Sequence, residues 1–236
     1  MDLTDQVAVV TGASSGIGQT IAISLAEQGV QVGLAARREE QLEEVAHQIE
    51  DIGGEAVVVP TDLRDEAQVA MMIETTLEKF GRLDILVNNA ATLHWATVAE
   101  ADVSAWRSTV ETNLLGTMFA SHHAVTQMLD QDTGHIVNIS SMAGRKPYPG
   151  VSDYTATKFG ITGFSETLRE EVIEDGIKVT LIEPGIVDSP MQPDEVRAVE
   201  DILEPEDIAR AVVYAVSQPI HVNINTIQLQ EMKNLI

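Results

Sequence analysis

The sequence predicts a doubly wound α/β fold, in which a parallel sheet carries helices on both faces. Apolar segments rich in β-branched residues alternate along the chain with amphipathic stretches of helical period. Most of these apolar segments are nearly continuous Val, Ile and Leu, as expected for strands covered on both faces. The β-α-β-α alternation predicts right-handed crossovers and one Rossmann-like domain over residues 1–236, with about seven strands.

Each element follows from this alternation. The predicted strands cover residues 7–11, 30–36, 56–60, 83–88, 135–140, 178–183 and 223–230. The predicted helices cover 16–28, 39–52, 65–80, 102–129, 153–174 and 206–217, with a short helix at 195–203. Glycines stand where several helices should end, namely Gly29, Gly53, Gly54, Gly81, Gly134 and Gly176. The proline-rich stretch 185–204 is expected to be a mobile lid over a site.

Charge and composition narrow the class of protein. The chain has 14 basic and 37 acidic residues, a net charge of −23, which argues against nucleic acid and anionic membranes as partners. The chain has only five lysines among these acids, which favours an acidic protein surface suited to a high-salt cytoplasm. The alternative is an ordinary acidic soluble protein. The apolar segments are too short to span a membrane, and the acidic first residues do not resemble a secretory signal. We therefore expect a cytoplasmic protein, and the absence of cysteine excludes thiol chemistry.

A glycine-rich turn links the first strand to the first helix. It runs from Thr11 to Gly18 with the spacing G-x-x-x-G-x-G. Backbone N–H groups at a helix start bind phosphate, and glycines allow a dinucleotide to approach closely. A structural turn can have the same sequence, but the position directly after a buried strand favours a cofactor site.

The end of the second strand indicates which cofactor binds. An acid there would favour NAD by binding the ribose hydroxyls, but the chain has Ala36 followed by Arg37 and Arg38. Arginine pairs with a 2′-phosphate, so we expect NADP(H), with Arg37 as the main contact and Arg38 as a second one. The alternative is that both are solvated charges. Cations are scarce in this chain and disfavoured at a helix start, which supports the cofactor role.

The next two strand ends supply further contacts. Asp62 and Leu63 follow the third strand, and we expect Asp62 to accept a hydrogen bond from the adenine amino group; alternatively, it caps the next helix. Asn89 and Ala90 follow the fourth strand, where a small residue lets the cofactor lie against the strand end.

Tyr154 and Lys158 share one face at the start of a predicted helix. A nearby ammonium favours the phenolate and lowers the pKa of tyrosine from about 10, so the pair can move a proton to or from a substrate oxygen. Ser141 lies just past the fifth strand, at the sheet edge where doubly wound folds bind ligands. The position of Ser141 at this edge is the reason that the four-residue spacing of Tyr154 and Lys158 indicates a catalytic pair.

Together these motifs resemble the short-chain dehydrogenase/reductase family over nearly the whole chain. The resemblance implies that Ser141 holds the substrate oxygen, Tyr154 is the general acid/base, Lys158 lowers the tyrosine pKa and grips the nicotinamide ribose, and Asn113 holds a water in a proton relay. It also implies that Ile186 and Ser189 hold the nicotinamide carboxamide. The full expected set of cofactor contacts is Gly12, Ser14, Ser15, Gly16, Ile17, Gly18, Arg37, Arg38, Asp62, Leu63, Asn89, Ala90, Tyr154, Lys158, Pro184, Gly185, Ile186 and Ser189. Two residues depart from the family pattern: Ser189 replaces the usual threonine, and Ala91 replaces a common glycine.

The resemblance leaves the substrate open. The chain end at 221–225 is similar to a subgroup acting on hydroxy amino acids and small aldehydes or ketones. A 3-oxoacyl-thioester reductase is the enzymatic alternative, although an acidic surface disfavours docking to an acidic acyl carrier protein. A non-catalytic NADP(H)-binding regulator is an alternative of another class. His94, Trp95, Met142, Tyr148 and Met191 are candidates for the pocket lining, no histidines are spaced as a metal site, and the long helices 102–129 and 153–174 imply a homodimer or homotetramer.

Overall fold

The chain folds around a twisted parallel sheet, as predicted. In this computed structural model, which describes residues 1–198 and 200–232, seven strands pair in the order β3-β2-β1-β4-β5-β6-β7. The order reverses beside β1, which pairs with both β2 and β4. The carboxyl ends on either side of this reversal form the crevice in which such folds bind ligands. The strands are β1 (Val7–Thr11), β2 (Gln31–Ala36), β3 (Ala56–Pro60), β4 (Ile85–Asn88), β5 (Gly134–Ile139), β6 (Ile177–Pro184) and β7 (Thr226–Leu229).

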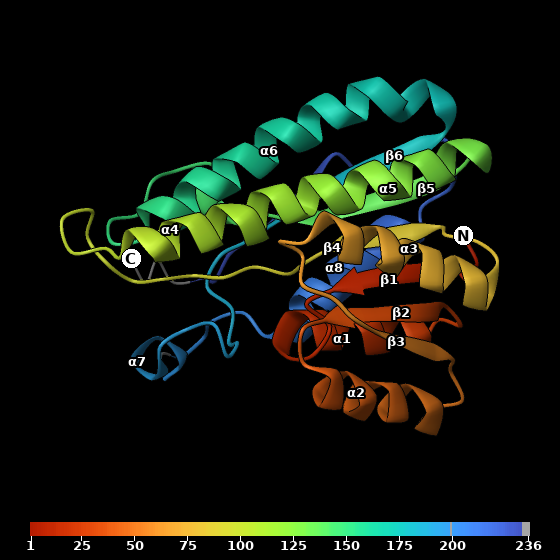
Figure 1. Cartoon of the computed structure of the whole chain (residues 1–236), viewed down its shortest axis with the longest axis horizontal. Helices are drawn as coiled ribbons and strands as arrows, with labels where there is room; N and C mark the ends of the chain where they lie inside the picture. The colour runs from red at the N-terminus through yellow and green to blue at the C-terminus, as the bar shows by residue number, and fades with distance from the viewer. Residues whose placement is uncertain (199, 233–236) are drawn as a thin grey trace.

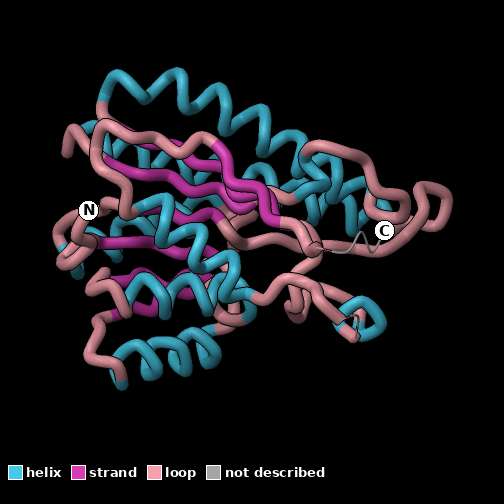
Figure 2. The backbone as a smooth tube through the Cα atoms, turned by 180° about the vertical axis from the view of Figure 1, so that it is seen from behind, coloured by secondary structure: helices cyan, strands magenta, loops and turns pink. Residues whose placement is uncertain are grey.

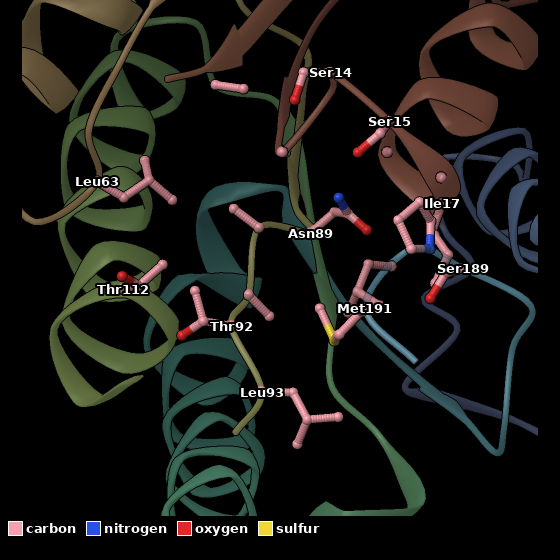
Figure 3. A pocket seen from close by; sticks show the side chains of 18 of the residues that line it. Ser14, Ser15, Ile17, Leu63, Asn89, Thr92, Leu93, Thr112, Ser189 and Met191 are labelled. Atoms are coloured by element: carbon pink, nitrogen blue, oxygen red, sulfur yellow. The ribbon is translucent and has the colours of Figure 1, made fainter. Parts of the chain in front are cut away.

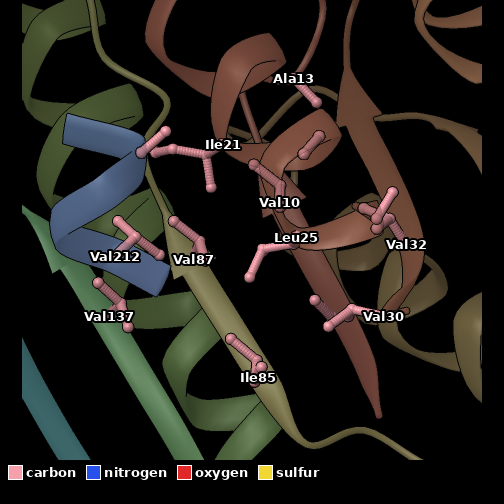
Figure 4. Close-up of a cluster of buried hydrophobic side chains, with 14 of the residues drawn as sticks. Val10, Ala13, Ile21, Leu25, Val30, Val32, Ile85, Val87, Val137 and Val212 are labelled. Carbon is pink, nitrogen blue, oxygen red and sulfur yellow. The ribbon is translucent and has the colours of Figure 1, made fainter. Parts of the chain in front are cut away.

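Helices cover both faces of the sheet (Figures 1 and 2). One layer packs α1 (Gly16–Ala26) between α2 (Glu39–Asp51) and α8 (Pro205–Val216). The other layer contains α3 (Glu66–Phe80), α5 (Gly116–Asp130) and α6 (Ser152–Val172), with α4 (Val103–Thr109) leading into α5. Alternate residues of β1 belong to the two hydrophobic cores, one on each face of the sheet. Val10 packs under α1 (Figure 4), and Val9 faces the opposite layer. Burial on both faces explains why the strands are continuously apolar.

Two helical predictions need correction. The stretch 102–129 is α4 and α5 joined through a π-helical segment, Val110–Leu115. The predicted helix 195–203 is only α7 (Asp194–Arg197), which Figure 1 shows apart from the helical layers. The chain is extended again at Leu203, which donates its N–H to Ile186 O at 2.9 Å and accepts from Asp188 N–H at 2.8 Å. This bridge competes with helix formation. Residue 199, within the predicted lid, lies outside the described residues.

One predicted helix end was wrong, and one predicted strand was too long. Gly134 begins β5, whereas α5 ends at Asp130. A Cβ on Gly134 would lie 2.3 Å from Met128 Sδ, so packing, not a left-handed turn, requires glycine here. β7 is shorter than residues 223–230, because the Asn223 side chain accepts from Val179 N–H at 3.1 Å and continues the ladder in place of backbone. Among the described residues, no helix is long and apolar enough to cross a membrane.

Candidate active site

A cleft of about 600 Å³ opens at the carboxyl edge of the sheet. It runs from the glycine turn, past the ends of β2, β3 and β4, to Ser141 and Tyr154. Figure 3 shows Leu63 and Thr112 on one side, facing Ile17 and Ser189 on the other. Of the expected cofactor contacts, Ile186 alone does not line this cleft; it lines the neighbouring side pocket. The cleft therefore gathers residues far apart in sequence into one elongated site.

The glycine turn is pinned to the end of β4. Asn89 Nδ2 donates to Thr11 O at 2.9 Å, and the Thr11 hydroxyl accepts from the backbone N–H groups of Asn89 and Ala90 at 3.0 and 3.1 Å. Gly12 has a φ of +68°, and a Cβ there would lie 2.8 Å from Asn89 Nδ2. A Cβ on Gly18 would lie 2.3 Å from Gly12 O. Larger residues would therefore push the turn away from the strand end.

The two arginines after β2 differ in their contacts. Arg38 Nη2 donates to the hydroxyls of Ser14 and Ser15 at 2.9 and 2.8 Å, which ties α2 to the glycine turn. Arg37 lines the same cleft and has a weaker electrostatic effect on Asp62. Arg37 was expected to be the main contact, whereas the structure brings Arg38 onto the turn.

Asp62 is held by a neighbouring arginine. Arg64 Nε donates to both Asp62 oxygens at 2.9 and 3.0 Å. The Arg64 side chain, its backbone N–H and its charge lower the pKa of Asp62, and Arg37 adds a smaller effect. The alternative of a helix cap at Asp62 is wrong, because Asp65 caps α3 by accepting from Ala67 N–H at 3.1 Å. An adenine bound at this end of the cleft would have to share the Asp62 carboxylate, as a hydrogen-bond acceptor, with Arg64.

Ser141 and Tyr154 meet at the far end of the cleft. Both line the cleft, and the Ser141 hydroxyl acts on Tyr154 closely enough to lower its pKa against the larger effect of burial. Ser141 Oγ also accepts from Ala143 N–H at 3.1 Å. The adjacent Ser140 is buried, and its hydroxyl donates to Lys158 O at 3.3 Å. The structure thus agrees with the choice of Ser141 over Ser140 as the residue beside the tyrosine.

Burial controls the protonation of the Tyr154–Lys158 pair. It raises the pKa of Tyr154 to about 12, and the Ser141 side chain only partly offsets this. Burial also lowers the pKa of Lys158 to about 7. Lys158 Nζ donates to Ile139 O at 2.7 Å and lies 5.3 Å from the centre of the Tyr154 ring. Burial and the Ser141 side chain account for the shift in the pKa of Tyr154, and the expected lowering by Lys158 does not contribute to it.

Asn113 lies in the π-helical segment and is fully buried. Its amide pairs with the backbone of Thr92: Oδ1 accepts from Thr92 N–H at 2.7 Å, and Nδ2 donates to Thr92 O at 2.9 Å. Asn113 therefore fixes the loop after β4 from its buried side, while its neighbour Thr112 lines the cleft. π-helical turns are frequent at functional sites.

A side pocket of about 120 Å³ adjoins Ser141 and Tyr154. Its walls include the expected candidates Trp95, Met142 and Tyr148, whereas His94 and Met191 line the main cleft. Lys146 and Glu231 bring one charge of each sign. Sequence reasoning missed Glu231, whose Oε2 accepts from Ile186 N–H at 3.3 Å, because nothing near it in the chain marks it.

A second feature missed from sequence lies beside Tyr154. The hydroxyl of Thr109 donates to the buried Asp153 at 2.8 Å and lies 3.1 Å from His94 Nδ1. These contacts hold one ring nitrogen of His94 against Thr109, while the residue also lines the cleft. Among the described residues, no group of three or more His, Asp or Glu side chains is placed to hold a metal ion.

Known proteins resemble the chain over nearly its whole length. A family model for short chain dehydrogenases matches residues 6–200. An uncharacterised oxidoreductase of Staphylococcus saprophyticus is 41% identical over 98% of this chain and 99% of its own, and one of Staphylococcus aureus strain USA300 is 40% identical over 97% and 98%.

Two solved structures share the fold. A metagenomic short-chain oxidoreductase in complex with NADP has a TM-score of 0.87 and 32% identity, covering 99% of this chain and 100% of that one. An alcohol dehydrogenase from the archaeon Thermococcus sibiricus, complexed with 5-hydroxy-NADP, has a TM-score of 0.88 and 28% identity, covering 96% and 97%.

Proposed function

Because the chain belongs to the short-chain dehydrogenase family, we propose that it is an NADP(H)-dependent oxidoreductase that interconverts a secondary alcohol and a carbonyl on a small substrate. The observation that carries the proposal is the placement of Ser141, Tyr154 and Lys158 together at one end of the 600 Å³ cleft, with Lys158 Nζ 5.3 Å from the centre of the Tyr154 ring. The glycine turn lies at the other end. One elongated site thus joins a proton donor to a phosphate-binding turn.

The cleft residues fit a phosphorylated dinucleotide. The turn offers backbone N–H groups at the start of α1, and both arginines line the cleft beside Ser14. Ala36 supplies no carboxylate to repel a 2′-phosphate. The two related structures, solved with NADP and with 5-hydroxy-NADP, support the same choice. The bound cofactor would supply or accept the hydride.

The residues of the chain handle the proton. Ser141 would hold the substrate oxygen, and the Tyr154 phenol, whose pKa of about 12 keeps it protonated at neutral pH, would donate to that oxygen during carbonyl reduction. Alcohol oxidation needs the phenolate. A charged Lys158 favours it, and the Lys158 pKa of about 7 lets this charge change near neutral pH. Asn113 would position the water that supplies the relay.

The side pocket favours a small substrate. Its volume of about 120 Å³ is far below that of the main cleft, and its walls combine aromatic and apolar side chains with the charged Lys146 and Glu231. A hydroxy amino acid, aldehyde or ketone suits this space better than a long acyl thioester. The complete set of Ser141, Tyr154, Lys158 and Asn113 argues against a purely regulatory role. Exposed apolar side chains on α5 and α6, including Met118 and Phe159, support a homodimer or homotetramer.

Substitution of Tyr154 by Phe tests the proposed function. Loss of general acid/base catalysis should lower turnover by about 100- to 10,000-fold, while NADPH still binds because the ring and the cleft remain. The measurements are NADPH fluorescence titration and turnover of L-serine or L-allo-threonine with NADP+, and of 2,3-butanedione or acetoacetyl-CoA with NADPH. Tyr214→Phe, on the exposed face of α8, is the matched control. Turnover by Tyr154→Phe at the wild-type rate would contradict the proposal, and cofactor binding with no wild-type turnover on the panel would favour a regulator.

A further inference from the structure

An ion pair between a partly exposed arginine and a buried glutamate joins the loop of Ser141 to the end of β6. Glu183 precedes Pro184 in β6 and is fully buried. One of its carboxylate oxygens accepts from Arg145 Nε at 2.6 Å, and the other accepts from Gln228 Nε2 on β7 at 2.8 Å. Arg145 directly follows the 3₁₀ turn that begins at Ser141. The pair therefore ties together two strand ends that both face the cleft.

Stability alone does not account for this pair. Removing a carboxylate from water is costly, and a well-packed apolar pair of similar size is often at least as stable as a buried ion pair. The cost falls mainly on Glu183, which is 0% exposed, whereas Arg145 is 36% exposed and also reaches Glu166 at 3.4 Å. What the ion pair adds is direction, because both carboxylate oxygens have fixed partners.

The fixed direction matters for the Ser141 hydroxyl. The turn from Ser141 to Arg145 is closed by hydrogen bonds, with Gly144 N–H donating to Ser141 O at 2.8 Å and Arg145 N–H donating to Met142 O at 3.0 Å. Ser141 Oγ lies 3.5 Å from Pro184 O, which is long for a hydrogen bond. This contact by itself cannot hold the Ser141 turn against the end of β6. The β5–β6 ladder ends one residue before Ser141, where Ser140 N–H donates to Ile182 O at 2.8 Å. Beyond this last backbone bond, the ion pair between Arg145 and Glu183 is the stronger tie between the two segments.

We propose that Arg145 and Glu183 are positioning residues, which hold the Ser141 hydroxyl in register with Tyr154 and with the Pro184–Gly185 end of β6. The inference rests on the proposed function, because it takes Ser141 to hold the substrate oxygen. Neither residue touches the reacting atoms. Because a shift of about 1 Å in a reacting group can cost on the order of 100-fold in rate, the pair acts on kcat through Ser141.

The double variant Arg145→Met/Glu183→Leu separates positioning from stability. Arg145→Met alone leaves a buried carboxylate with its charge unpaired, so its melting temperature should fall on the order of 10 °C. The double variant should recover to within a few degrees of the wild type. Its kcat should nevertheless stay about 10- to 100-fold low, with the Kd of NADPH changed by less than about twofold because the glycine turn is untouched. Arg145→Lys, which keeps the charge, should regain part of kcat.

Arg82→Met is the matched control for lost stability. It removes the ion-pair partner of the buried Asp84, at the opposite edge of the sheet, where Arg82 Nε donates at 2.7 Å. Its melting temperature should fall while kcat stays at the wild-type value. A stable double variant with wild-type kcat overturns the inference, and so does a double variant that loses kcat and NADPH binding in equal measure.

A readout without turnover distinguishes this inference from the proposed function. If the wild type converts none of L-serine, 2,3-butanedione and acetoacetyl-CoA, the proposed function fails. A crystal structure of the double variant still tests the positioning. The Ser141 hydroxyl should lie about 1 Å or more from its wild-type place beside Tyr154. An unchanged geometry of Ser141 and Tyr154 in that structure contradicts the inference.

Discussion

The two arginines that follow β2 differ in how they contact the glycine turn. Arg38 donates to two hydroxyls of the glycine turn, whereas Arg37 lines the cleft and, among the described residues, has no hydrogen bond to that turn. An arginine held in place loses less freedom when it binds a phosphate, so Arg38 suits a 2′-phosphate at least as well as Arg37. The sequence order of the two residues does not reveal this difference.

Alanine at either arginine tests cofactor selection. Arg37→Ala and Arg38→Ala should each raise the Kd of NADPH by roughly tenfold or more, because a charge-assisted hydrogen bond is lost. Binding of NADH, which lacks the 2′-phosphate, should change little. Fluorescence titration with both cofactors measures the ratio, and equal loss of NADH and NADPH binding would show that the arginines serve the turn and not the phosphate.

His135 is a second residue with a measurable consequence. Burial in the sheet, with a smaller effect of the Lys178 charge, lowers the pKa of His135 to about 3. Its Nε2 is paired with the Thr180 hydroxyl at 2.8 Å, and its Nδ1 has no partner among the described residues. A second proton on this ring would be buried without an acceptor, so the folded state keeps His135 neutral.

Stability should therefore fall in acid. Between pH 6.5 and 3 the unfolded chain binds a proton at His135 that the folded chain does not, so stability declines as the pH drops through this range. The difference amounts to about 2 kcal/mol at pH 5, taking about 6.5 for the unfolded chain. Urea unfolding at pH 7, 6 and 5 should show a smaller decline for His135→Gln. Parallel declines in both proteins would assign the acid sensitivity to other groups.

At the element scale, helix ends and helix interiors place opposite demands on glycine. Gly81 ends α3 with a φ of +80° and meets no atom within 4 Å of an added Cβ. Gly163 lies inside α6 and likewise meets nothing. The two sites differ in backbone conformation and not in packing.

Alanine should have opposite effects at these two glycines. Gly81→Ala should cost about 1 kcal/mol, because an L side chain disfavours the left-handed conformation. Gly163→Ala should gain up to about 1 kcal/mol from helix propensity. Urea unfolding of the two variants measures both signs, and each serves as the control for the other. A stabilised Gly81→Ala would refute the assignment of that helix end.

The short helix α7 and the start of β5 show why element boundaries were harder to predict than element types. The 195–203 stretch has helical sequence, yet Leu203 bonds to Ile186 and Asp188 across the chain, and this bridge ends the helix at Arg197. Gly134 looked like a helix end but follows from contact with Met128. In both cases a partner remote from the local pattern made the choice.

At the scale of the whole molecule, a charge of −23 on 236 residues creates self-repulsion that salt screens. If the acidic shell is suited to high salt, the melting temperature should rise by several degrees between dilute buffer and concentrated KCl. Sodium sulfate also strengthens apolar burial, so KCl is the better probe of screening. A melting temperature indifferent to KCl would favour an ordinary acidic protein.

The order of strands and helices, the glycine turn and the spacing of Ser141, Tyr154 and Lys158 could all be predicted from local sequence patterns. These depend on local periodicity and turn chemistry, which neighbouring residues encode. The tertiary structure decided which side chains meet: Arg38 with the glycine turn, Glu231 with Ile186, and Arg145 with Glu183. It also decided that burial, and not Lys158, governs the pKa of Tyr154. Such contacts depend on strand register and on the packing of elements distant in the chain, which no local pattern specifies.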